Sequence, residues 1–151
     1  MLTIMVSMGV AMLISLLGTP LFIKFLVKKQ YGQFIRQDGP TSHATKRGTP
    51  TMGGVVIILA TVIGYAVANI VAGRMPGASG WLLIFLMVGM GFIGFLDDFM
   101  KISNQRSLGL SPAGKIVGQA LVGILFAVLA LQFRNDEFRT PASMRISFVR
   151  D

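Results

Sequence analysis

Four long apolar runs, separated by shorter polar segments, dominate the pattern of the chain, at 2–26, 52–72, 81–96 and 116–133. Run 52–72 has 21 residues and no charged side chain. A helix of that length spans about 30 Å, the thickness of a bilayer's hydrocarbon core. Run 81–96 has only 16 residues, which is short unless its helix includes 77–80 or continues past Asp97. The pattern predicts an all-α, multi-span membrane protein with four transmembrane helices.

The composition supports a membrane protein with a single domain over 1–151. Hydrophobic residues make up 53% of the chain and charged residues 13%, too few to coat a soluble globule. The net charge is +8, and most of the charged side chains lie between the apolar runs. They therefore indicate how the chain is oriented in a lipid bilayer, and we expect no nucleic-acid partner. Residues 1–23 carry no charge, so the basic start of a signal peptide is missing, and the first run is expected to remain as a span.

The distribution of Lys and Arg predicts the topology. Five of them lie between the first two runs, whereas Arg74 alone lies between the second and third, so the first loop is expected to be cytoplasmic. The loop after run 81–96 then lies on the same side, and both termini lie outside. Four arginines in the tail oppose this arrangement, a conflict that disappears if the tail normally continues into another span: Arg134, Arg139, Arg145 and Arg150.

Asp97 and Asp98 are the strongest candidates for chemistry, because two adjacent carboxylates at the end of an apolar run repel each other. Mg²⁺ would remove that repulsion, and carboxylate oxygens are the ligands it takes beside substrate phosphates. On a continuing helix, Lys101 is four residues from Asp97 and three from Asp98, within reach of both. The residue types alone leave two interpretations open: a metal and phosphate site, or an ion-paired helix end.

The loop before run 52–72 is the second candidate. Thr51 marks the expected start of a helix, where free backbone N–H groups beside Gly53, Gly54 and Lys46 would suit a phosphate. The alternative is that the glycines serve helix packing and Thr51 is only a cap. His43, the single histidine, is on residue type alone more often a hydrogen-bonded turn residue than a base or ligand.

Together these segments resemble the phospho-N-acetylmuramoyl-pentapeptide transferases. The resemblance rests on Arg36-x-Asp38-Gly39-Pro40-x-Ser42-His43-x-x-Lys46-x-Gly48-Thr49-Pro50-Thr51-Met52-Gly53-Gly54, on Asp97-Asp98-x-x-Lys101, and on Gly109-Leu110 with Lys115 beyond. It implies Mg²⁺-dependent transfer of phospho-MurNAc-pentapeptide from its UDP-linked donor to undecaprenyl phosphate, forming lipid I and UMP. It also implies a bacterial plasma membrane with the active-site loops in the cytoplasm. A homodimer is one assembly that the sequence leaves open.

The resemblance also implies roles for single residues. Asp97 and Asp98 match the family's aspartate pair, which is expected to be catalytic and to engage the metal. Four further residues match polar positions of the substrate cleft, and His43 falls inside the first block. The four are Lys46, Thr51, Lys101 and Lys115.

The chain departs from the family by its length. The family has more spans, and later cytoplasmic loops with a further aspartate, an Asn/Asp-rich block and a histidine cluster, none of which is present here. The chain is therefore expected to be an N-terminal fragment or the product of a truncated gene model, and to be inactive alone. Two alternatives stay open: a sister transferase of another amino sugar, and a small channel or accessory protein whose mouth Asp97 and Asp98 would form.

Overall fold

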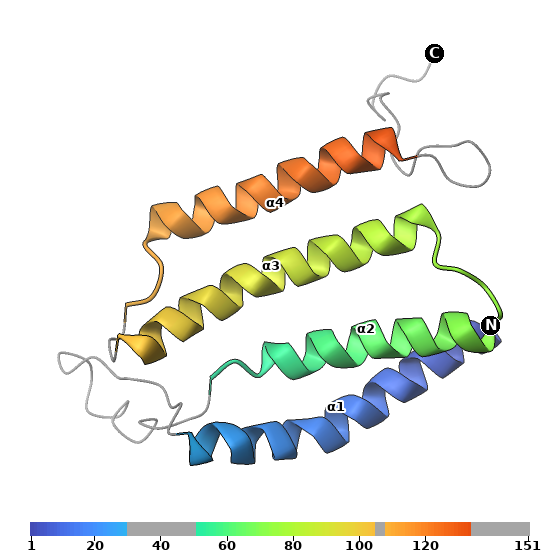
Figure 1. The fold of residues 1–151 in the computed structure, drawn as a ribbon, viewed down its shortest axis with the longest axis horizontal. Coiled ribbons are helices and arrows are strands. Elements are labelled where there is room, and N and C mark those ends of the chain that lie inside the picture. The colour runs from blue at the N-terminus through green and yellow to red at the C-terminus, as the bar shows by residue number, and fades with distance from the viewer. Residues whose placement is uncertain (30–50, 105–107, 134–151) are drawn as a thin grey trace.

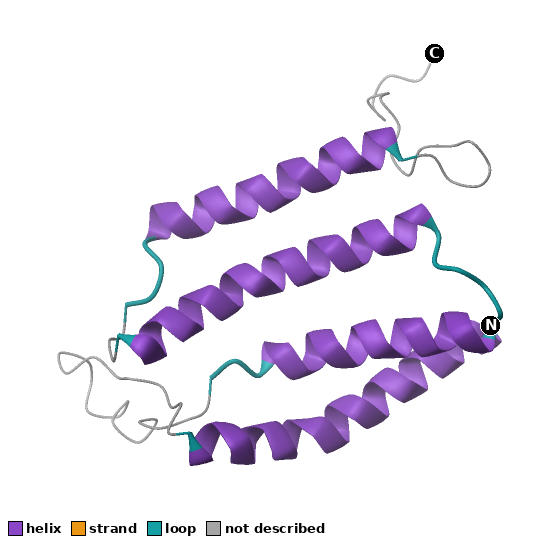
Figure 2. Cartoon of the chain, viewed as in Figure 1, coloured by secondary structure: helices purple, strands orange, loops and turns teal. Residues whose placement is uncertain are grey.

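The computed structural model describes residues 1–29, 51–104 and 108–133, and this part of the chain forms four helices and no strand (Figures 1 and 2). The helices are α1 (Leu2–Lys28), α2 (Gly54–Val71), α3 (Ala78–Ser103) and α4 (Pro112–Gln132). All four are long and apolar enough to cross a membrane. The prediction of an all-α protein with four membrane helices is confirmed.

The helices run alternately up and down, so their ends gather at two opposite sides (Figure 1). At one side of the bundle α1 and α3 end and α2 and α4 begin. We call this side the aspartate end, because Asp97 and Asp98 lie near the C-terminal end of α3. The other side, where α2 ends and α3 begins, is called the opposite end. The aspartates and the described residues just before α2, from Thr51 to Gly53, therefore lie at the same end of the bundle.

Helix α3 is longer than its apolar run. It begins at Ala78, after Gly77 as N-cap, and continues past the aspartates to Ser103, giving 26 residues and a length of about 39 Å. The helix thus includes residues 78–80 before run 81–96 and also continues past Asp97. Both extensions were the ways in which a run of 16 residues could become long enough to span a membrane. Asp97 and Asp98 consequently lie inside a helix, more than a turn before its end.

Helix α2 begins later than the sequence indicates. Its first residue is Gly54 and its N-cap is Gly53, with no side-chain capping bond. Met52 has φ 69°, a left-handed conformation that is uncommon outside glycine and that keeps the chain out of the helix at this point. The interpretation of Thr51 as a simple helix cap is therefore wrong.

Helix α4 begins earlier than its apolar run, because a good start signal precedes that run. The Ser111 hydroxyl accepts a hydrogen bond from the Gly114 N–H at 3.1 Å, and Pro112 occupies the first turn. The early start brings Lys115 into the first turn of α4.

Each described helix packs only against its neighbours in the chain, with the most extensive contact between α1 and α2 and the least between α2 and α3. Small residues permit these contacts. A Cβ at Gly64 would meet Ser7 and Ala11 of α1, and one at Gly89 would meet Val122 of α4.

The glycines at the start of α2 and within α3 differ in what lies beside them. Gly89 and Gly91 lie at helix contacts, whereas Gly53, Gly54 and Gly94 have open space where a Cβ would stand, among the described residues. Packing within this part of the chain therefore does not explain those three glycines.

Candidate functional site

The two aspartates differ in their surroundings although they are adjacent on α3. Asp97 is only 8% exposed and is the one buried charged residue in the described part of the chain. Of the side chains alone, that of Asp97 is 12% exposed and that of Asp98 is 29% exposed. Consecutive residues of a helix point about 100° apart, which explains how one turns inward and the other outward.

Lys101 joins the two carboxylates. Its Nζ lies 2.7 Å from Oδ2 of Asp97 and 3.1 Å from Oδ1 of Asp98. This confirms the contact expected from the three- and four-residue spacing on a continuing helix.

Asp97 has two further partners, both from the segment around the start of α4. The Leu110 N–H donates to its Oδ1 at 2.8 Å, and Lys115 Nζ lies 3.0 Å from the same oxygen. Gly109 approaches so closely that an added Cβ would collide with the Asp97 carboxylate and with its backbone oxygen. Asp97 is therefore held by three donors and covered by a turn that has no room for a side chain.

Asp98 faces α2 instead. Its Oδ2 accepts a hydrogen bond from the Met52 N–H at 3.3 Å, a long bond that reaches across to the segment just before α2. Beside it, the buried Thr51 hydroxyl has no hydrogen-bond partner among the described residues. Thr51, which the sequence predicts as a site residue, therefore lies near the aspartate pair, because its neighbour Met52 bonds to Asp98.

An apolar crevice of about 310 Å³ opens between α2 and α3 at the two aspartates. Its polar mouth is formed by the carboxylates, and at its apolar end Ile58 lies against Gly91. Nine residues line it: Met52, Gly54, Val55, Ile58, Gly91, Gly94, Phe95, Asp97 and Asp98. A charged mouth on an apolar crevice suits a ligand with a charged head and an apolar tail.

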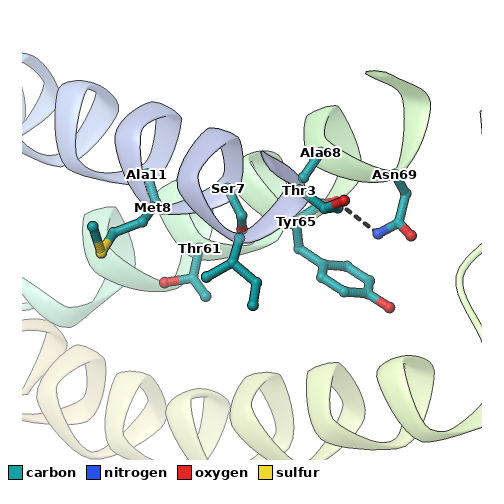
Figure 3. A pocket seen from close by; sticks show the side chains of 9 residues that line it. Thr3, Ser7, Met8, Ala11, Thr61, Tyr65, Ala68 and Asn69 are labelled. Atoms are coloured by element: carbon teal, nitrogen blue, oxygen red, sulfur yellow. Dashed lines mark hydrogen bonds between the residues drawn. The ribbon is translucent and has the colours of Figure 1, made fainter. Parts of the chain in front are cut away.

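A second cavity, of about 370 Å³, lies between α1 and α2 towards the opposite end (Figure 3). Its polar side chains include Ser7, Thr61, Tyr65 and Asn69, and it has no charged group. The Asn69 amide donates to the Tyr65 backbone oxygen of its own helix at 2.8 Å. The larger cavity is therefore not where the charged groups gather, and we assign the candidate site to the smaller crevice.

The site fits a metal ion only in a limited way. Lys101 and Lys115 already balance the charges of the two aspartates, so their mutual repulsion alone no longer argues for a cation. Nowhere in 1–29, 51–104 and 108–133 do three His, Cys, Asp or Glu side chains gather into a metal site. The partly exposed Asp98 fits Mg²⁺ held by one carboxylate together with substrate phosphates, a common arrangement for this ion.

The structure thus brings together four of the predicted residues and leaves two untested. Asp97, Asp98, Lys101 and Lys115 form one ion-paired cluster, whereas His43 and Lys46 lie outside the described residues. Sequence reasoning missed the Leu110 and Met52 N–H donors. The only signal for these donors was that Gly109-Leu110 and Met52 fall within the matched motifs, which assign no role to either donor.

Comparison with known proteins first identifies the segment that leads into α2. The family model described as phospho-N-acetylmuramoyl-pentapeptide-transferase signature 1 matches residues 46–58, which include Lys46, Thr51 and the start of α2. No solved structure matches the chain.

Curated relatives match the chain over its whole length. A protein of Beutenbergia cavernae is 70% identical over 151 residues, which cover 100% of this chain and 42% of the relative. One of Paenarthrobacter aurescens is 60% identical over 157 residues, with the same shares, and one of Streptomyces griseus is 55% identical over 143 residues, with shares of 95% and 40%. All three are named phospho-N-acetylmuramoyl-pentapeptide-transferase.

The chain spans about 42% of the length of the first two of these relatives and corresponds to their N-terminal part. The signature at the start of α2 and the similarity along all four helices agree on one assignment: the chain corresponds in sequence to the N-terminal part of the phospho-N-acetylmuramoyl-pentapeptide-transferases.

Proposed function

We propose that the protein containing this chain transfers phospho-MurNAc-pentapeptide from its UDP-linked donor to undecaprenyl phosphate, forming lipid I and UMP in peptidoglycan synthesis. An oxygen of the lipid phosphate attacks the sugar-linked phosphorus of the donor, and the bond from that phosphorus to the bridging oxygen breaks as UMP leaves. The observation that carries the proposal is the similarity over the whole chain to transferases of this name, up to 70% identity.

The ion-paired cluster supports chemistry at a membrane surface. The aspartates lie beyond the apolar run of α3 but before its end, where a water-soluble nucleotide and a lipid phosphate can meet. The crevice between α2 and α3 offers an apolar path for the first part of the lipid chain, with the phosphate at the mouth. Lys115, whose side chain is 41% exposed, is placed to neutralise an incoming phosphate.

The family resemblance implies that the aspartate pair holds the catalytic and metal-binding groups, and the proposed function needs at least the exposed carboxylate of that pair. Asp98 offers the exposed carboxylate, for metal binding or for accepting a proton from the lipid phosphate. Bound Mg²⁺ would neutralise charge that develops on the diphosphate during transfer. Lys101 orients the pair, and Thr51, Lys46 and His43 complete the substrate-binding set on the side of α2.

The channel alternative is less well supported by the geometry. A channel mouth needs carboxylates open to passing ions, whereas both aspartates are paired with Lys101 and Asp97 is buried. A sister transferase with another amino sugar would use the same cluster. The donor specificity assay described next separates it from the proposed activity.

The test is formation of lipid-linked product by purified full-length protein, with Mg²⁺, undecaprenyl phosphate and either UDP-MurNAc-pentapeptide or UDP-N-acetylglucosamine. We expect product only with the pentapeptide donor, and none from residues 1–151 alone. Phosphoryl transfer needs charge stabilisation from several directions, which a partial cleft lacks. Absence of product from the full-length protein with the pentapeptide donor would refute the proposal.

The proposed orientation places the aspartate end in the cytoplasm of a bacterial plasma membrane. Ser42→Cys, in the first loop, and Ala78→Cys, at the opposite end, test it with an impermeant thiol reagent added to intact cells. We expect labelling at position 78 and not at 42. The reverse pattern would put the site on the wrong side for a cytoplasmic nucleotide.

A further inference from the structure

We infer that Asp97 is a positioning residue, held by a clamp made of Gly109, Leu110 and Lys115, and that Asp98 alone presents its carboxylate to the substrate or metal. The inference deepens the proposed function and rests on it for its activity measurements. It divides the work between two adjacent carboxylates that sequence reasoning treats as one group.

The hydrogen bonds of Asp97 carry the first step. Its Oδ1 accepts from Leu110 N–H at 2.8 Å and from Lys115 at 3.0 Å, and its Oδ2 accepts from Lys101 at 2.7 Å. With 8% of the residue exposed and three short contacts made, little of either oxygen is left for a ligand. A further cation would have to displace a lysine from a buried carboxylate.

Asp98 has the complementary environment. Its contacts are longer, at 3.1 Å to Lys101 and 3.3 Å to Met52 N–H, and its side chain is 29% exposed. Weak and exposed contacts are exchanged readily for a phosphate or a hydrated metal ion. Both carboxylates line the crevice, but only Asp98 combines that position with free accepting capacity.

The close approach of Gly109 explains how the Asp97 side chain is held in place. The turn before α4 passes so close that an added Cβ would meet the Asp97 carboxylate and its backbone oxygen. Close approach is what allows Leu110 to donate its N–H, and the Ser111 cap starts α4 at once, which brings Lys115 back to the same oxygen. The clamp thereby ties the start of α4 to α3 and sets the position of Lys115 at the mouth.

The test compares Gly109→Ala, Asp97→Asn and their double variant in the full-length protein, with Gly123→Ala as matched control because a Cβ there meets nothing. We expect Gly109→Ala to lower kcat about 10²-fold with both aspartates intact, since small misplacements have costs of that size. If both changes break one clamp, the double variant is no slower than the slower single variant. Gly123→Ala should keep wild-type kcat.

The dependence on Mg²⁺ separates the two aspartates. We expect Asp98→Asn to raise the half-saturating Mg²⁺ concentration or to abolish turnover, whereas Asp97→Asn and Gly109→Ala lower kcat without changing that concentration. Equal shifts for Asp97→Asn and Asp98→Asn would overturn the division of roles. The clamp would be overturned if the reductions in kcat caused by Gly109→Ala and Asp97→Asn multiply in the double variant. A normal kcat in Gly109→Ala would overturn it as well.

Thermal unfolding of the same variants tests the clamp without catalysis. We expect Gly109→Ala and Asp97→Asn to lower the unfolding temperature by amounts that do not add in the double variant. Additive shifts would contradict the clamp even if the protein is an active transferase. If the full-length wild type makes no product at all, the proposed function fails, while this measurement still decides on the clamp.

Discussion

Two cavities in the described part of the bundle differ in size and in charge. The cavity between α1 and α2 is the larger, at about 370 Å³, and its polar groups are uncharged (Figure 3). The crevice between α2 and α3 is smaller, at about 310 Å³, yet two carboxylates stand at its mouth with Lys101 and Lys115 beside them. In a membrane protein, charge near the edge of the hydrocarbon core identifies a site better than cavity size, because ionisable side chains are costly there and usually serve a function.

The largest expected effect comes from removing the exposed carboxylate of the crevice. Asp98→Asn in the full-length protein should lower turnover at least about 10²-fold, since a positioned acid or base contributes that much. The matched change in the other cavity, Asn69→Ala, should leave turnover within about twofold, because among the described residues its amide donates to the Tyr65 backbone oxygen of its own helix. Initial rates of lipid-linked product formation measure both. Similar losses in the two variants would mean that the cavities do not differ in function.

Filling the crevice should have a smaller effect. A Cβ at Gly94 meets open space, so Gly94→Phe can place a ring in the crevice without a backbone clash. We expect the KM for undecaprenyl phosphate to rise about tenfold, the scale of a modest change in an apolar contact, while the KM for the nucleotide donor stays unchanged.

Thr61→Leu, which fills the cavity between α1 and α2, is the matched control for that measurement. It should change neither KM. An unchanged acceptor KM in Gly94→Phe would show that the lipid chain lies elsewhere, without touching the assignment of the aspartates.

Sequence reasoning went furthest where the relevant interactions are local. The four spans follow from apolar runs, and the contact of Lys101 with Asp97 follows from four-residue helical spacing. The hydrogen-bond partners that other elements supply could not be predicted from local spacing. Leu110 N–H reaches Asp97 only through the turn before α4, and Met52 N–H reaches Asp98 only because a left-handed residue delays the start of α2.

The close contact of α1 with α2 at Gly64 predicts an effect on stability and not on chemistry. A Cβ at Gly64 would stand 2.7 Å from the Ser7 backbone oxygen and 2.9 Å from the Ala11 Cβ. Gly64→Ala should therefore destabilise the protein by about 1–3 kcal/mol, as overpacking does. Thermal unfolding in detergent measures this, with Gly123→Ala as control. The protein that remains folded should keep the wild-type Mg²⁺ requirement, because α1 takes no part in the crevice.

The smallest expected effect comes from the cap that starts α4. The Ser111 hydroxyl accepts from Gly114 N–H at 3.1 Å, and Ser111→Ala removes this bond at a cost of about 1 kcal/mol. The cap stands between Leu110 and Lys115, which both contact Asp97, so a frayed first turn loosens the crevice mouth as well as the helix. We expect a slightly lower unfolding temperature and a few-fold lower kcat. Ser111→Asp, which keeps a capping oxygen, should restore the stability. Normal kcat in Ser111→Ala, at a reduced unfolding temperature, would show that the start of α4 can loosen without moving Lys115.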